Sequence, residues 1–316
     1  MHPALSVILF TTVAGAGYGL LGLLCGLGAT GLLPQDRWLA IVGFALGLLA
    51  VTFGLIASTF HLGRPARAWR AFFYWPSSWL SREAVLSLAT LIPAAFFLYL
   101  WLAGRPVAAP PARGFGLVAA GLALLTVLAT AMIYASLKPV RAWRNIWVVP
   151  NYLLLGTMTG ALWLAALLHG FGQARPWQSE LLVLLILAAW LGKLLYWHSI
   201  RRGSRRSTPE SATGLGRIGR VRSFERPHTA DNYLLKEMGF AVARKHADKL
   251  RRIASLAAFL APAVLTVIAA VAPRWLATAA ALLGAGSAIF GVLIERWLFF
   301  AEARHAVTLY YGAEAA

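Results

Sequence analysis

Long apolar stretches alternate with short polar connections along most of the chain. A helix needs about 20 apolar residues to cross a bilayer, and eight stretches meet that length. They cover roughly residues 5–33, 38–60, 83–103, 114–136, 150–171, 179–200, 251–272 and 275–300. Most of them end at a proline or at charged residues, and none alternates apolar with polar residues as membrane-spanning strands do. The pattern predicts an all-α integral membrane protein with eight transmembrane helices.

Composition supports lipid as the solvent of this chain. Of its 316 residues, 59% are hydrophobic and 13% are charged, whereas a soluble domain carries about 25% charged residues. The net charge of +18 lies almost wholly in the connections, so membrane topology explains it better than nucleic-acid binding does. The single cysteine, Cys25, excludes an internal disulfide or a cysteine-rich metal site.

The distribution of Lys and Arg predicts the orientation. Connections after the first, third, fifth and seventh predicted helices hold only five of the 29 basic residues, and the other 24, including Arg296 and Arg304, are counted on the opposite side. Basic connections remain cytoplasmic. We therefore predict a multi-pass protein of the bacterial inner membrane with both termini in the cytoplasm. The five exceptions are Arg37, Arg105, Arg113, Arg175 and Arg274.

The chain divides into three predicted parts. Residues 1–200 hold the first six helices, residues 201–250 form a basic cytoplasmic loop, and residues 251–316 hold the last two helices and a tail. The loop ends in an amphipathic stretch, Asn232 to Leu250, which suits a membrane surface or a partner. A solvated connecting helix is the alternative. The predicted partner-docking residues are Arg201, Arg202, Arg205, Arg206 and Lys245.

A short motif occurs twice. The segment Arg64–Arg70, with the sequence RPARAWR, recurs as Lys138–Arg144, with the sequence KPVRAWR. Each copy follows an even-numbered predicted helix, so both copies lie on the same face of the membrane. Two generic basic loops with interfacial tryptophans would also explain the likeness.

One histidine and one carboxylate fall at the same predicted membrane edge. His61 ends the second predicted helix, and Glu83 opens the third. Ionisable residues at such depth are functional candidates, and this pair could bind a quinone oxygen and exchange its protons. Nearby Arg64 and Arg82 could hold Glu83 ionised. A plain ion pair at a helix start and an interfacial histidine would explain the same spacing, which leaves both interpretations open.

Other cofactors are not expected on this chain. No two of the seven histidines share a depth inside the predicted helices, so we predict no haem, and one cysteine cannot ligate an iron–sulfur cluster. The glycine-rich segment Gly214–Gly219 follows no strand and is interpreted as loop. We expect no metal and no catalytic residue.

Four motifs in order resemble the dimethyl sulfoxide reductase anchor subunit (DmsC) family, and the likeness covers the whole chain. They are His61–Pro65, Trp79–Glu83, Asn232–Met238 and Glu295–His305. The resemblance implies two four-helix bundles and an anchor that carries no metal. It implies an iron–sulfur subunit and a molybdopterin catalytic subunit as partners, membrane lipid around the anchor, and electron exchange with menaquinone or ubiquinone.

The resemblance also assigns roles to residues. The family's quinol-site histidine and glutamate fall on His61 and Glu83, and Tyr134 matches a tyrosine near the end of the fourth helix. The predicted quinone site comprises His61, Arg64, Ser81, Arg82, Glu83 and Tyr134. Because basic connections surround it, the site and the partners should face the cytoplasm, as in the anchor of cytoplasmic membrane-bound sulfite dehydrogenase.

The expected function is therefore that of an anchor and quinone-reactive subunit of a molybdopterin oxidoreductase, with sulfite as a candidate substrate of the complex. An anchor of a DMSO- or N-oxide-type reductase, which would oxidise quinol, is the nearest alternative. A membrane transporter would need polar residues near mid-membrane in broken helices, and the sequence holds few. A passive anchor without a quinone site is the remaining alternative.

Overall fold

The computed structural model describes residues 5–60, 64–202, 207–222, 224–225 and 245–311. Within these ranges, eight helices are long and apolar enough to cross a membrane, which confirms the predicted all-α architecture. The described residues contain no strand, and only Val140 and His305 pair, as an isolated antiparallel bridge. The hydropathy pattern therefore determines the fold class correctly.

The spans begin and end within a few residues of their predicted limits. The first consists of α1 (Leu5–Leu9), the π-helix η1 (Phe10–Ala14) and α2 (Gly15–Ala29), and the seventh of α11 (Ala247–Ser255), η4 (Leu256–Leu260) and α12 (Ala261–Val271). The others are α3 (Arg37–Thr59), α4 (Trp79–Leu102), α5 (Ala112–Ala135), α6 (Val148–Phe171), α7 (Pro176–Arg202) and α13 (Arg274–Ala301).

Capping residues determine where two of the helices begin. The Asp36 carboxylate accepts a hydrogen bond from the Leu39 backbone N–H at 2.7 Å, at the start of α3. Ser78 caps α4 in the same way, since its hydroxyl accepts from the Ser81 N–H at 3.4 Å. Both side chains satisfy N–H groups that a helix start leaves unpaired. The cap at Ser78 starts α4 one turn before Glu83, the predicted first residue.

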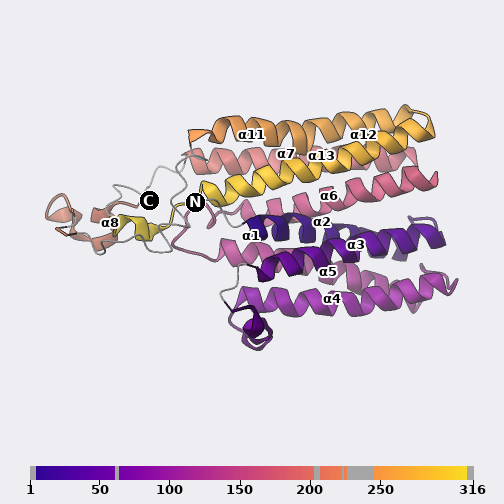
Figure 1. Cartoon of the computed structure of the whole chain (residues 1–316), viewed down its shortest axis with the longest axis horizontal. Helices are drawn as coiled ribbons and strands as arrows, with labels where there is room; N and C mark the ends of the chain where they lie inside the picture. The colour runs from indigo at the N-terminus through magenta and orange to yellow at the C-terminus, as the bar shows by residue number, and fades with distance from the viewer. Residues whose placement is uncertain (1–4, 61–63, 203–206, 223, 226–244, 312–316) are drawn as a thin grey trace.

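The helices run side by side in one block, with α2 near its centre (Figure 1). Helix α2 packs on α3, α5 and α6, and α13 packs on α6 and α12. Helices α2 and α6 approach so closely that a Cβ atom on Gly19 would overlap the carbonyl oxygen of Gly156. Small residues at interfaces permit such approaches in membranes. Because α2 and α6 join the first four spans to the last four, the grouping into two four-helix bundles remains a prediction.

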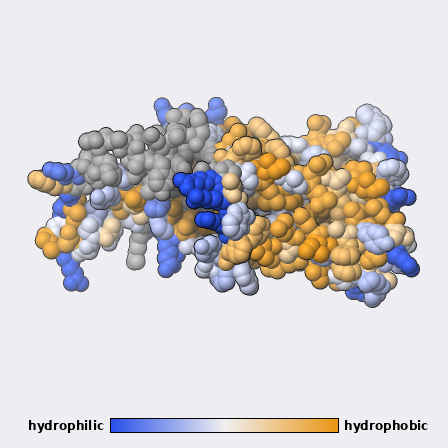
Figure 2. Space-filling model, turned by 60° about the horizontal axis from the view of Figure 1, so that its bottom comes forward, coloured by the Kyte–Doolittle hydropathy of each residue, from blue (hydrophilic) through white to orange (hydrophobic). Residues whose placement is uncertain are grey.

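The two ends of the helical block differ. A broad hydrophobic belt covers the helices and is bounded by hydrophilic residues (Figure 2). The start of α1, the end of α13 and the short helices η2 (Pro65–Tyr74) and α8 (Pro209–Thr213) all lie at one end (Figure 1). The connections predicted to face the cytoplasm thus share one face.

The two copies of the repeated motif lie in different surroundings. In the second copy, Trp143 Nε1 donates to the carbonyl oxygen of Phe299 at 3.0 Å, and Val140 pairs with His305 beside η5 (Ala306–Leu309). In the first copy, η2 leaves Trp69 exposed at the surface. Of the predicted amphipathic stretch, residues 232–244 lie outside the described residues, and from Ala247 the chain forms α11. The 3-10 turn η3 (Leu215–Arg217) lies within the basic loop.

Candidate functional site

Glu83 is buried between α4 and α5. Its side chain is 4% exposed, and its carboxylate accepts a hydrogen bond from the Thr130 hydroxyl. Ser81 beside it is buried as well, and farther along the same helix pair the hydroxyls of Thr90 and Thr126 lie 3.2 Å apart. A buried carboxyl held by a single hydroxyl retains acceptor sites that protein groups do not fill. Glu83 therefore remains a candidate site residue, as predicted from the sequence.

The predicted arginine partners of Glu83 have other roles. Arg82 donates to the carbonyl oxygens of Trp75 and Pro76, at 3.0 and 2.7 Å, and its guanidinium lies 4.2 Å from the centre of the Trp79 ring. Arg64 is exposed. Within the described part of the chain, no ion pair joins Glu83 to either arginine. The expectation that they hold Glu83 ionised is not supported by this geometry, because Arg82 fixes the loop instead.

The remaining predicted quinone-site residues are His61 and Tyr134. His61 lies outside the described residues, so its position relative to Glu83 stays a prediction. Tyr134 lies one turn beyond Thr130 on α5 and is enclosed by aromatic rings. Its ring centre is 5.9 Å from that of Tyr152 and 5.3 Å from that of Phe300. Tyr134 therefore packs α5, the helix that carries Thr130, against α6 and α13.

A buried group of three charged residues was not predicted from the sequence. Lys193 of α7 donates to the Glu295 carboxylate of α13, and Arg296 Nε lies 3.2 Å from the other oxygen of Glu295. All three side chains are at most 3% exposed. The sequence signal that could have identified this group is a charged residue inside an apolar stretch. The count of 24 basic residues on one side includes Lys193 and Arg296, but both lie within spans and are buried.

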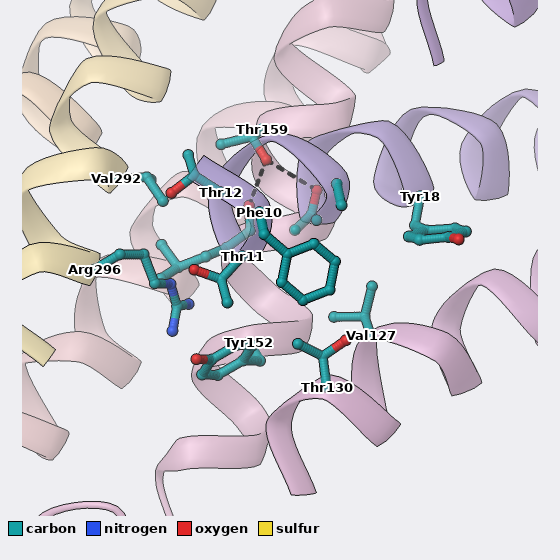
Figure 3. Close-up of a pocket in the computed structure, with 14 residues that line it drawn as sticks. Phe10, Thr11, Thr12, Tyr18, Val127, Thr130, Tyr152, Thr159, Val292 and Arg296 are labelled. Carbon is teal, nitrogen blue, oxygen red and sulfur yellow. Dashed lines mark hydrogen bonds between the residues drawn. The ribbon is translucent and has the colours of Figure 1, made fainter. Parts of the chain in front are cut away.

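Arg296 lines a small cavity, which we call the polar cavity because Thr12, Thr130 and Tyr152 line it as well. Its guanidinium carbon is 3.7 Å from the centre of the Tyr152 ring. Figure 3 shows Arg296 and Tyr152 on one side of this cavity, Thr130 below it, and Tyr18 and Val127 on the opposite side. The cavity has a volume of about 20 Å³. Thr130 lines the cavity and also bonds to Glu83. The predicted carboxyl is therefore joined through Thr130 to a space that Arg296 of the buried charge group also lines.

A second cavity adjoins the first and is almost wholly apolar. It lies between α2, α5 and α6 and has a volume of about 120 Å³. Tyr18 and Val127 line both cavities. Leu124, which also lines the second cavity, is 48% exposed on the outer face of α5. The apolar space therefore reaches the lipid-facing side of the helix block.

The predicted docking residues lie near the end of α7. Arg201 forms an exposed ion pair with Asp248 at 3.3 Å, and Arg202 and Lys245 are exposed, while Arg205 and Arg206 lie outside the described residues. Close to them, Arg251 pairs with Glu302, where burial raises the pKa of the carboxyl although Arg251 lowers it. These contacts tie α11 to the end of α13 and leave several cations available to a partner.

The sequence model of the DMSO reductase anchor subunit (DmsC) family matches residues 1–301. The chain belongs to this family. It is similar to a subunit of the sulfite dehydrogenase of Allochromatium vinosum, with 32% identity over 340 aligned positions that cover both chains completely. No solved structure matches. The DmsC chain is thus a multi-pass membrane anchor subunit of an oxidoreductase, and it works in a complex with other catalytic and electron-transfer subunits.

Proposed function

We propose that this DmsC anchor exchanges electrons between the membrane quinone pool and a cluster-bearing partner subunit. The observation that carries the proposal is the buried Glu83 carboxyl, which the Thr130 hydroxyl joins to the first of two adjoining cavities, one polar and one apolar. A quinone has a polar head and an apolar tail and arrives from the lipid phase. Its head needs hydrogen-bonding groups, and its ring and tail need an apolar route, which this pair of cavities supplies in outline.

The chemistry needs a proton-exchanging group at the site. Conversion of a quinone to a quinol adds two electrons and two protons, and the reverse reaction releases them. Glu83 can accept or donate a proton, and the Thr130 hydroxyl connects it to the polar cavity. His61 is the second proposed proton carrier, because imidazole exchanges protons near neutral pH. Around these two proton carriers, the proposed site is completed by Ser81, Arg64, Arg82 and Tyr134.

The complex is proposed to oxidise sulfite and reduce quinone, because the full-length relative is a subunit of sulfite dehydrogenase. The proposed partners are an iron–sulfur subunit and a molybdopterin catalytic subunit, and the quinone is menaquinone or ubiquinone. Both partners and the site would face the cytoplasm of a bacterial inner membrane, where positively charged connections remain. A DMSO-type reductase would use the same parts with electrons flowing out of quinol.

The test is purification of the complex through a tag on this chain. We expect iron and molybdenum to accompany it, and sulfite to reduce an added quinone. If both metals arrive but sulfite reduces only a soluble dye, the chain is a passive anchor. If sulfite is inert and a quinol drives reduction of DMSO, the direction of electron flow is reversed. A chain that carries no redox subunits would contradict the proposal as a whole.

A further inference from the structure

The polar cavity has hydrogen-bonding groups that lack partners. The hydroxyls of Thr12 and Tyr152 are buried, line the cavity and have no hydrogen-bond partner within the described residues. The Arg296 guanidinium lies over the face of the Tyr152 ring, and the geometry completes no hydrogen bond between it and the Tyr152 hydroxyl. Buried polar groups are nearly always paired. The cavity is therefore built for a guest with at least one hydrogen-bonding atom.

The charge beside the cavity selects the kind of guest. Lys193, Glu295 and Arg296 place two cations and one carboxylate in a buried group. Arginine keeps its proton in proteins, so the side chain nearest the cavity carries a permanent positive charge. Fixed donors of this kind stabilise an oxygen on which negative charge develops during a reaction. The polar cavity therefore suits a hydrogen-bond acceptor oxygen that gains electron density better than it suits a cation or a hydrogen-bond donor.

The sizes of the two cavities match such a guest. A volume of about 10–15 Å³ is enough for one water, so the polar cavity of about 20 Å³ has room for one oxygen-sized group. The apolar cavity of about 120 Å³ is close in size to an engineered cavity of about 150 Å³ that accepts benzene. Tyr18 and Val127 line both cavities, so the two adjoin, and one ligand can place its ring in the apolar cavity and an oxygen in the polar cavity.

We propose that Arg296 and Tyr152 bind one carbonyl oxygen of the quinone, with the ring in the apolar cavity between α2, α5 and α6. This inference rests on the proposed function and adds an internal site to it. Two electrons from the cluster-bearing partner and two protons convert both C=O groups to C–OH. Arg296 only donates hydrogen bonds and keeps its proton, so the protons come from other groups such as Glu83. Lys193 and Glu295 position Arg296.

The test measures quinone binding as well as turnover in the purified complex. A short-chain ubiquinone is titrated without reductant, and binding is followed by the quenching of tryptophan fluorescence. Removing one neutral hydrogen bond with Tyr152→Phe should weaken binding by about three- to tenfold. Arg296→Lys, which loses the planar donor pair at a charged site, should weaken it by roughly ten- to a hundredfold. The KM for quinone should rise in step.

A matched control is available in the same aromatic region. Tyr196 is equally buried, but its hydroxyl donates to the carbonyl oxygen of Ala142 at 3.3 Å and does not line the cavity. Tyr196→Phe should therefore bind quinone as the unaltered complex does. If Arg296→Lys fails to assemble, Tyr152→Phe decides, because it retains the ring that packs against Arg296.

Two failures can be told apart. If the unaltered complex binds and reduces quinone but Tyr152→Phe binds it with unchanged affinity, the internal site is wrong and the proposed function stands. The same conclusion follows if Tyr196→Phe weakens binding as much as Tyr152→Phe. If the unaltered complex neither binds nor reduces quinone, the proposed function fails, and this inference fails with it.

Discussion

Thr130 of α5 donates a hydrogen bond to the carboxylate of Glu83 of α4, although the two residues lie 47 positions apart in the sequence. Thr130 also lines the polar cavity, together with residues of α6 and α13, so the bond joins a buried carboxyl to that cavity. Among the predicted site residues that the structure describes, Glu83 is thus the one with a geometry suited to proton exchange. Arg64 is exposed and Arg82 is half-buried against its own loop.

The first prediction concerns the two proposed proton carriers. Glu83→Gln and His61→Ala should each lower quinone-linked turnover by about 10²–10⁴-fold, the range typical of a lost proton-transfer group. The complex should still assemble, and dye-linked activity of the soluble subunits should persist. Glu180→Gln serves as the control, since Glu180 is exposed at the other end of the helix block. Full quinone-linked activity in either variant would make that residue structural.

The second prediction concerns orientation. Reporter fusions at Arg113 and Arg226 should give opposite signals, with Arg226 in the cytoplasm, because 22 of the 29 basic residues share its side once the buried Lys193 and Arg296 are left out. An alkaline phosphatase and a fluorescent protein fused in turn at each position provide the reciprocal controls. An external signal at Arg226 would remove the basis for cytoplasmic partners.

The third prediction tests the basic loop. Residues 201–252 hold 14 basic and five acidic residues, and exposed charge pairs weaken with salt. Replacing Arg201, Arg202, Arg205 and Arg206 by Gln should release the soluble subunits at lower salt than in the unaltered complex, as measured by what remains on washed membranes. Replacing Arg105 and Arg113, on the opposite face, should change nothing. Unchanged attachment would restrict the loop to a role in orientation.

The fourth prediction concerns the close approach of α2 and α6. Gly19→Ala places a Cβ atom on top of the carbonyl oxygen of Gly156, so the helices must separate, at a cost of about 1–3 kcal/mol. Gly121→Ala on α5 meets no atom within 4 Å and should be neutral or stabilising by up to about 1 kcal/mol. Thermal unfolding in detergent compares the two. Equal midpoints would mean that the interface is looser than the structure has it.

The fifth prediction follows from the charges of the buried group. Glu295→Met leaves the cations Lys193 and Arg296 buried together, which should cost about 3–5 kcal/mol or more. Lys193→Met leaves Glu295 and Arg296 as a balanced pair and should cost clearly less. The measurement is the unfolding midpoint of each purified variant. If both substitutions cost the same, Lys193 is as necessary as Glu295, and the group holds an additional negative charge.

Hydropathy and charge along the chain were enough to place the eight spans, their limits to within a few residues, and the face that carries the basic connections. These properties can be read from each segment alone, because the bilayer acts on every helix separately. The same pattern pointed to Glu83. Which charges meet, such as Lys193 with Glu295, 102 positions apart, became known only from the packed helices. Such contacts depend on how each helix is rotated and packed. The sequence around a charged residue in an apolar stretch therefore does not show which residue it will contact.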